Sequence, residues 1–210
     1  MKNRILKLAA LLLVMGPLAA FAVPITITYT TDNRVDPPYW GLCDDSSCRT
    51  GDIFPTGANA GDWRFADSYT VDLGAGTHYF AWFGLNAGTG SSTNPGGFLA
   101  EITWSAGSNS SSSAWDVASP FDDVLGGSAD WHSATQYGAN GGANIWTSVK
   151  GGPIAGISGD AQWIWSANNS NIDMDQEVVV RTSITVPEPS SLALLGLSLL
   201  GLGLARRQTE

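Results

Sequence analysis

The sequence predicts an all-β fold, an antiparallel β-sandwich of jelly-roll type, flanked by an N-terminal signal helix and a short C-terminal hydrophobic helix. Several segments alternate apolar and polar residues with a period of two, and turns rich in Gly, Ser and Asn separate them. No window of helical length in the middle of the chain has a 3.6-residue period. The expected strands are residues 25–30, 69–73, 79–83, 98–104 and 178–186, and the expected long turns are 86–97 and 105–113.

Each strand is predicted from its own composition. Ile25, Ile27 and Tyr29 alternate with threonines, so one face of this segment is apolar and the other is polar. The later segments repeat this alternation or are rich in the β-branched and aromatic residues that favour strands. Short strands joined by polar turns within one domain favour a sandwich, and long connections between its sheets suit a jelly roll.

The acidic residues are concentrated in the middle of the chain. The protein has 210 residues, which is enough length for one domain with a substantial core, and its net charge is −9. All but two of its 19 acidic residues, but only half of its ten basic ones, lie between residues 23 and 186. A domain this acidic repels phosphate backbones, so we expect no nucleic-acid partner. Nine Trp, seven Phe and five Tyr residues argue against a disordered chain.

The first 22 residues have the pattern of a secretory signal peptide. A basic start is followed by an apolar run over residues 8–20. Ala20 and Ala22 are spaced as signal peptidase requires, so we expect cleavage after Ala22 and export across the inner membrane. An uncleaved anchor is the alternative, but the apolar run is short for a membrane span.

The C-terminal segment has three parts in order: a proline-punctuated motif, an apolar run of Leu, Gly and Ala over residues 192–205, and a basic pair. At about 1.5 Å per residue, the run would be about 21 Å long as a helix, shorter than a bilayer core of about 30 Å. Arginines favour the cytoplasmic side, which places the preceding chain outside the inner membrane. The motif and the basic pair are Pro187, Glu188, Pro189, Arg206 and Arg207.

This order resembles the PEP-CTERM sorting domain over residues 186–207. The resemblance implies processing by exosortase, a membrane protease-transpeptidase, after a transient stay in the inner membrane. It also implies removal of the tail and delivery of the protein to the cell surface or a polysaccharide matrix. The expected domains are therefore a signal peptide (1–22), a β-sandwich domain (23–185) and a sorting signal (186–210).

The middle of the chain resembles the galactose-binding-like jelly-roll domains, whose loops at one end bind sugars. The likeness lies in residues 62–64, 69–73, 81–86, 97–102, 161–166 and 178–186. The sequence departs from the family pattern after Asp32-Asn33, which leads into a Pro-Pro pair and the cysteine loop instead of an Asn-Gly hairpin.

Cys43 and Cys48 are the only cysteines, and in an exported protein they predict a local disulfide. Two cysteines and two distant histidines are too few soft ligands for a zinc site, so no cofactor is expected.

Calcium is the alternative cofactor, because the chain offers groups of oxygen ligands, which suit this ion. Its candidate ligands are the alternating residues Asn171, Asp173, Asp175 and Glu177 and the pairs Asp44-Asp45 and Asp122-Asp123.

A solvated acidic turn is the simpler interpretation of those residues, since the glycine and terminal glutamate of an EF-hand loop are absent.

The sequence also lacks the motifs of nucleophilic catalysis. Ser158 does not have the spacing of a nucleophile elbow, and neither histidine has a nucleophile near it in sequence. A glycosidase needs two carboxylates, but an abundance of acids does not identify such a pair. We therefore expect no enzyme.

Aromatic and polar residues in predicted loops are candidates for ligand binding. Sugar rings stack on flat aromatic side chains, and Asp and Asn bond their hydroxyls. Tryptophans on strand-like segments, at positions 82, 104, 163 and 165, are expected in the core. The candidates outside those segments are Trp115, Asp116, Asp130, Trp131 and His132.

The sequence thus predicts an exported, exosortase-sorted surface or matrix protein that binds exopolysaccharide without catalysis. Two alternatives stay open. One is a purely structural or adhesive surface protein without a sugar site, and the other is a glycoside hydrolase.

Overall fold

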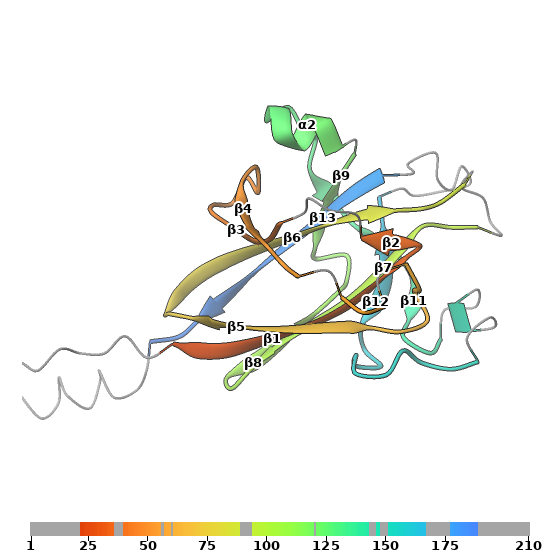
Figure 1. The fold of residues 1–210 in the computed structure, drawn as a ribbon, viewed down its shortest axis with the longest axis horizontal. Coiled ribbons are helices and arrows are strands. Elements are labelled where there is room, and N and C mark those ends of the chain that lie inside the picture. Colours follow the sequence, from red (N-terminus) through yellow and green to blue (C-terminus); the bar gives the residue numbers. More distant parts are fainter. Residues whose placement is uncertain are drawn as a thin grey trace, which may run out of the picture. The chain divides into compact units, whose positions relative to one another are not determined.

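The protein was analysed as a computed structural model that describes residues 22–35, 40–55, 57–59, 61–88, 94–119, 121–142, 146–147, 151–166 and 177–188. Residues Val23–Pro187 form one compact unit. Within it, two antiparallel sheets pack together, which confirms the predicted all-β sandwich (Figure 1). The predicted signal helix and the predicted C-terminal helix lie outside the described residues.

The first sheet is centred on β1, which pairs with β5 on one side and β7 on the other. The strand order is β11-β12-β7-β1-β5, and β8 pairs with a further part of β7. The strands are β1 (Val23–Asp32), β5 (Asp67–Leu73), β7 (Gly97–Trp104), β8 (Gly107–Ser110), β11 (Thr135–Ala139) and β12 (Gln162–Trp165).

The second sheet is centred on β6 and β13, which pair along their whole length. The strand order is β10-β9-β13-β6-β3-β4, and β2 also pairs with β6. The strands are β2 (Arg34–Val35), β3 (Trp40–Cys43), β4 (Gly51–Ile53), β6 (Gly76–Leu85), β9 (Asp116–Ala118), β10 (His132–Ser133) and β13 (Glu177–Val186).

All five predicted strands lie inside strands of the structure, namely β1, β5, β6, β7 and β13. The other eight strands, all shorter than β5, and the helix α2 were not among the expected elements. β8 falls in the expected turn 105–113, where a tight turn folds the chain back on β7. The helix α2 (Phe121–Gly126) has six residues, too few to produce a visible 3.6-residue period.

Aromatic side chains fill the space between the sheets. The ring of Trp82 stacks on Trp115 with centroids 5.7 Å apart, and it also contacts Phe98 at 5.2 Å. Ile25 and Ile27 of β1 are fully buried beside them, as the alternation predicts. A ring of this size buries about 150–250 Å², worth about 4–6 kcal/mol before entropy is subtracted. This cluster therefore holds the two sheets together.

A smaller apolar cluster lies on the other face of the first sheet, around Leu99, which is fully buried. Trp146 stacks on Trp163 with centroids 4.4 Å apart and planes at 6°. The side chain of Asn140 holds Ile154 and Ile157 in this cluster, because its Nδ2 donates to their carbonyls at 3.0 and 2.9 Å.

The first and last strands of the compact unit meet at one end of the sandwich. Val23 pairs with Leu73, and Val186 pairs with Gly76. The start of β1 and the end of β13 therefore flank the turn from β5 to β6 (Figure 1). We call this end, defined by Val23, residues 73–76 and Val186, the terminal pole.

Candidate ligand-binding pocket

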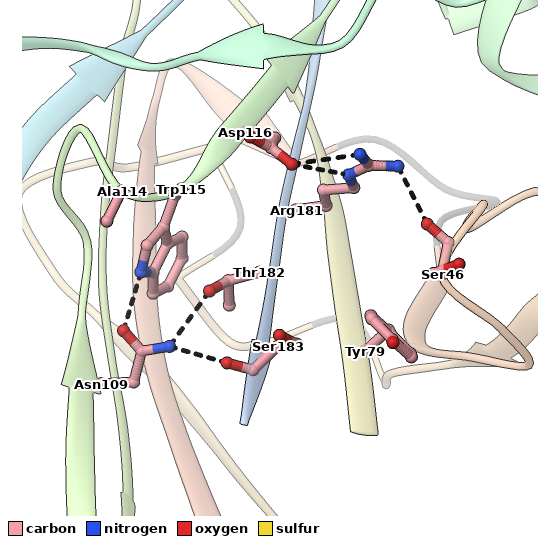
Figure 2. A pocket seen from close by; sticks show the side chains of 9 residues that line it. All are labelled: Ser46, Tyr79, Asn109, Ala114, Trp115, Asp116, Arg181, Thr182 and Ser183. Atoms are coloured by element: carbon pink, nitrogen blue, oxygen red, sulfur yellow. Dashed lines mark hydrogen bonds and ion pairs between the residues drawn. The ribbon is translucent and has the colours of Figure 1, made fainter. Parts of the chain in front are cut away.

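A polar pocket of about 250 Å³ lies at the point where β9 stops pairing with β13 (Figure 2). β9 pairs with Val179, Val180 and Arg181 only, whereas β13 continues to Val186. No described strand pairs with that edge of β13 beyond Arg181, so the edge borders the pocket. The lining residues are Ser46, Tyr79, Asn109, Ala114, Trp115, Asp116, Arg181, Thr182 and Ser183.

Asn109 of β8 joins the two sheets at one wall of the pocket. Its Nδ2 donates to the Thr182 hydroxyl and to the Ser183 carbonyl, both at 3.0 Å. Its Oδ1 accepts a hydrogen bond from the indole nitrogen of Trp115 at 2.9 Å. This side chain therefore caps the open edge of β13 and satisfies a buried tryptophan.

Arg181 forms the opposite wall. Its Nε and Nη2 donate to Oδ2 of Asp116 at 3.2 and 3.1 Å, and its Nη1 donates to the carbonyl of Ser46 at 2.9 Å. Its guanidinium carbon lies 3.8 Å from the centroid of the Trp131 ring. Arg181 is thus held on three sides, and Asp116 balances its charge.

Ser46 is positioned by a small cross-linked loop. A disulfide joins Cys43 to Cys48, and both cysteines are buried against the outer face of the second sheet. Arg49 continues from this loop, and its Nε donates to the carbonyl of Leu125 in α2 at 3.2 Å. The disulfide loop therefore sits between β3 and α2 and presents the Ser46 carbonyl to Arg181.

Tyr79 supplies the aromatic ring of the pocket. It is half-buried on β6, next to β13 in the second sheet. Figure 2 shows Tyr79 and Asn109 on opposite sides of Thr182 and Ser183. A ligand in the pocket would therefore meet an aromatic ring on one side and an amide on the other.

Trp115 was expected to offer its ring to a ligand from a loop, and this expectation is wrong. Its side chain is 1% exposed, and its ring packs against Trp82 and Phe98 in the core. The chain enters the short strand β9 directly after Trp115, so this residue faces the other sheet. Trp115 is nevertheless among the residues that line the pocket.

The structure brings Asp116 and Trp131 together through Arg181. Asp116 lines the pocket, whereas Trp131 is half-buried and lies against the guanidinium. The other two predicted site residues, Asp130 and His132, are exposed and do not line the pocket. The His132 ring nitrogens lie 3.2 Å from the carbonyl oxygen of Asp130 and 3.1 Å from that of Ser166.

Sequence reasoning missed Tyr79, Asn109 and Arg181 as site residues. Tyr79 and Arg181 lie in predicted strands, and Asn109 lies in a serine-rich stretch interpreted as a turn. The amide of Asn109, with one serine before it and four after it, was the only local signal for a polar site. Nothing in the sequence places these three residues next to one another.

Few ionisable side chains line the pocket. The described residues contain no group of three or more His, Cys, Asp or Glu side chains that could hold a metal ion. Of the proposed calcium ligands, Asn171, Asp173 and Asp175 lie outside the described residues, and Glu177 is exposed at the start of β13. The pocket lining has a single carboxylate, Asp116.

Residues 185–207 match the family model of the PEP-CTERM protein-sorting motif. The chain carries this sorting signal. A PEP-CTERM signal marks an exported protein that is anchored in the membrane before exosortase processes it. No curated protein and no solved structure matches the chain, so the likeness to galactose-binding-like jelly rolls stays a prediction.

The PEP-CTERM match begins inside the folded unit. Its first residue, Thr185, belongs to β13 and pairs with Thr77, and Val186 is 1% exposed. The matched region therefore overlaps the last two residues of β13. In the part of the chain that the structure describes, no helix is long and apolar enough to cross a membrane, and the apolar run 192–205 lies outside that part.

Proposed function

We propose that this protein is a surface or matrix component that binds exopolysaccharide without catalysis, and that the pocket beside β13 receives one neutral sugar unit. One observation carries the proposal. A partly accessible tyrosine ring and several hydroxyl-bonding side chains line the same polar pocket of a chain that carries a PEP-CTERM signal.

The chemistry of the lining suits a sugar ring. The apolar C–H face of a pyranose can stack on Tyr79, while its hydroxyls bond to polar side chains. Arg181 contacts Oδ2 of Asp116, and no described residue donates to Oδ1, which can accept from a sugar hydroxyl. Thr182 and Ser183 add hydroxyl groups at the pocket floor.

The size and charge of the pocket restrict the ligand. Its volume of about 250 Å³ lies below the range of about 300–1,000 Å³ typical of drug-sized ligands, which supports a single ring at the end of a chain or a side branch. Asp116 and Arg181 are its only charged lining residues, and they cancel each other. A neutral sugar fits this balance better than a uronate.

The absence of catalysis is supported by the lining as well. Glycoside hydrolysis uses two carboxylates on either side of the scissile bond, about 5–10 Å apart. The pocket provides Asp116 alone, and that carboxylate is paired with Arg181. The arrangement is suited to holding a sugar and lacks a second acid to cleave it.

Affinity electrophoresis of the protein from its host, in gels containing the host's exopolysaccharide, tests the proposal. Ser183→Trp fills the pocket, and Thr77→Trp puts the same side chain at an exposed position on the neighbouring strand β6, outside the pocket lining and the sorting signal. We expect retardation of the natural protein and of Thr77→Trp, and loss of retardation in Ser183→Trp. No retardation of the natural protein would refute binding, and equal retardation of all three would refute the pocket.

A further inference from the structure

β5 forms an open edge of the first sheet. It pairs with β1 in a continuous register over its seven residues, and no described strand pairs with its other side. An unpaired edge offers a row of backbone N–H and C=O groups to another strand. Figure 1 shows β5 beside β1, running toward the terminal pole.

This edge has few of the features that usually prevent pairing. β5 contains no Lys and no Pro, and its register with β1 has no bulge. Its two charges, Asp67 and Asp72, are close to its ends. Asp67 is held within the chain, because its Oδ1 accepts hydrogen bonds from the backbone and side-chain nitrogens of Asn59 at 3.0 and 3.1 Å.

The sequence of β5 is complementary to itself in one antiparallel register. With Thr70 opposite Thr70 of a second copy, Asp72 faces Ser68 and Tyr69 faces Val71. Hydroxyl–carboxylate and aromatic–β-branched neighbours are favourable cross-strand pairs. A parallel in-register pairing would instead place Asp72 opposite Asp72, which is unfavourable.

We propose that β5 pairs antiparallel with β5 of a second copy of this protein, centred on Thr70. The pairing extends a row of hydroxyls that already crosses the sheet, since Thr70 and Thr26 lie 3.0 Å apart through their hydroxyl oxygens. It also covers apolar surface. Ile53 is 57% exposed and precedes Phe54, whose ring packs 4.7 Å from that of Tyr69 of β5.

The direction of the pairing determines what it can connect. β5 ends at Leu73, which belongs to the terminal pole, so antiparallel pairing puts the terminal poles of the two copies at opposite ends. The chain leaves each sandwich at the terminal pole, after Val186, so the chains of the two paired copies leave the contact in opposite directions.

Disulfide trapping of protein isolated from its host tests the register. Opposed residues in an antiparallel pair have Cα atoms about 4.5–5.5 Å apart, a distance that a disulfide can span. We expect Thr70→Cys to form covalent dimers roughly tenfold faster than Thr103→Cys, an exposed control on the same face of the central strand β7. Ser68→Cys should cross-link to Asp72→Cys when the two are mixed, and not to itself.

A charge exchange provides a second test without cysteines. Beads coated with Thr70→Lys, or with Thr70→Glu, should cluster less than beads coated with the natural protein, and a mixture of the two should regain clustering. Thr70 is exposed, so these variants keep the core intact. Thr70→Cys dimers no faster than the Thr103→Cys control, self-linked Ser68→Cys, or unchanged clustering of both charged variants would each overturn the proposal.

Discussion

The indole nitrogen of Trp146 donates a hydrogen bond to Oδ2 of Asp32 at 2.9 Å in the interior of the protein. Asp32 is 7% exposed, and burial raises the pKa of its carboxyl to about 6, although the bond from Trp146 lowers it. The native state therefore binds a proton at Asp32 more tightly than the unfolded chain does. The carboxylate form is the less stable one in this setting.

The pH dependence of stability follows from this difference. Since the folded pKa of Asp32 lies above the ordinary value of 3.8, the free energy of unfolding should fall as pH rises from about 4 to about 6, by about 2 kcal/mol from this group. Asp32→Asn keeps an acceptor for Trp146 and should remove this part of the slope. Urea unfolding across that pH range measures it, and identical slopes in both proteins would contradict the assignment.

Replacing Asn109 should affect stability through Trp115. Asn109→Ala removes the acceptor of a buried indole N–H and both bonds to β13, so we expect a loss of about 1–3 kcal/mol in the free energy of unfolding. Asn109→Asp keeps the acceptor and should recover part of the loss. Tryptophan fluorescence during urea unfolding reports both values. Equal losses in the two variants would show that the Trp115 bond has no role.

Arg181 should matter more than its ion-pair partner. Arg181→Ala removes the ion pair, the bond to Ser46 and the contact with Trp131, and we expect a cost of about 2 kcal/mol. Asp116→Ala removes only a half-exposed pair and should cost less than about 1 kcal/mol. Thermal unfolding of the two variants tests whether Arg181→Ala is the less stable one. An equal loss of stability in both variants would contradict the prediction.

Gly84 is constrained by its neighbours. A Cβ atom there would lie 2.7 Å from the ring of Trp165 and 3.1 Å from Cγ2 of Thr31, so Gly84→Ala should destabilise the sandwich by about 1–3 kcal/mol. Gly159→Ala is the matched control, because no heavy atom lies within 4 Å of its added Cβ. Calorimetry that found the two variants equally stable would disprove the packing argument.

The long strands could be predicted because their side chains repeat over many residues. Residues 98–104 and 178–186 each show several alternations, and both lie in central strands. β9 has three residues, too few for any period, so the sequence did not reveal that the chain places Trp115 in the core.

The pocket depends on contacts that no local pattern records. Tyr79 and Arg181 are far apart in sequence and become neighbours only through the pairing of β6 with β13. Asn109 reaches β13 from the other sheet. Asp116 was a candidate from its place beside Trp115, but its pairing with Arg181 depends on the register of β9 against β13. The residue types in the sequence indicated a polar binding site, but the pairing of the strands determines where in the fold that site lies.

β13 carries both the pocket floor and the exit of the chain, so a mechanical load can reach that exit along two routes. A pull between a ligand at Thr182 and Ser183 and whatever holds the chain beyond Val186 passes through a few residues of one strand and leaves the core unstrained. A pull between β5 and the same attachment instead loads the ten pairs of β6 and β13, the bonds of Asn109 to β13 and the core between the sheets. One domain could thus bear force along two routes of very different compliance.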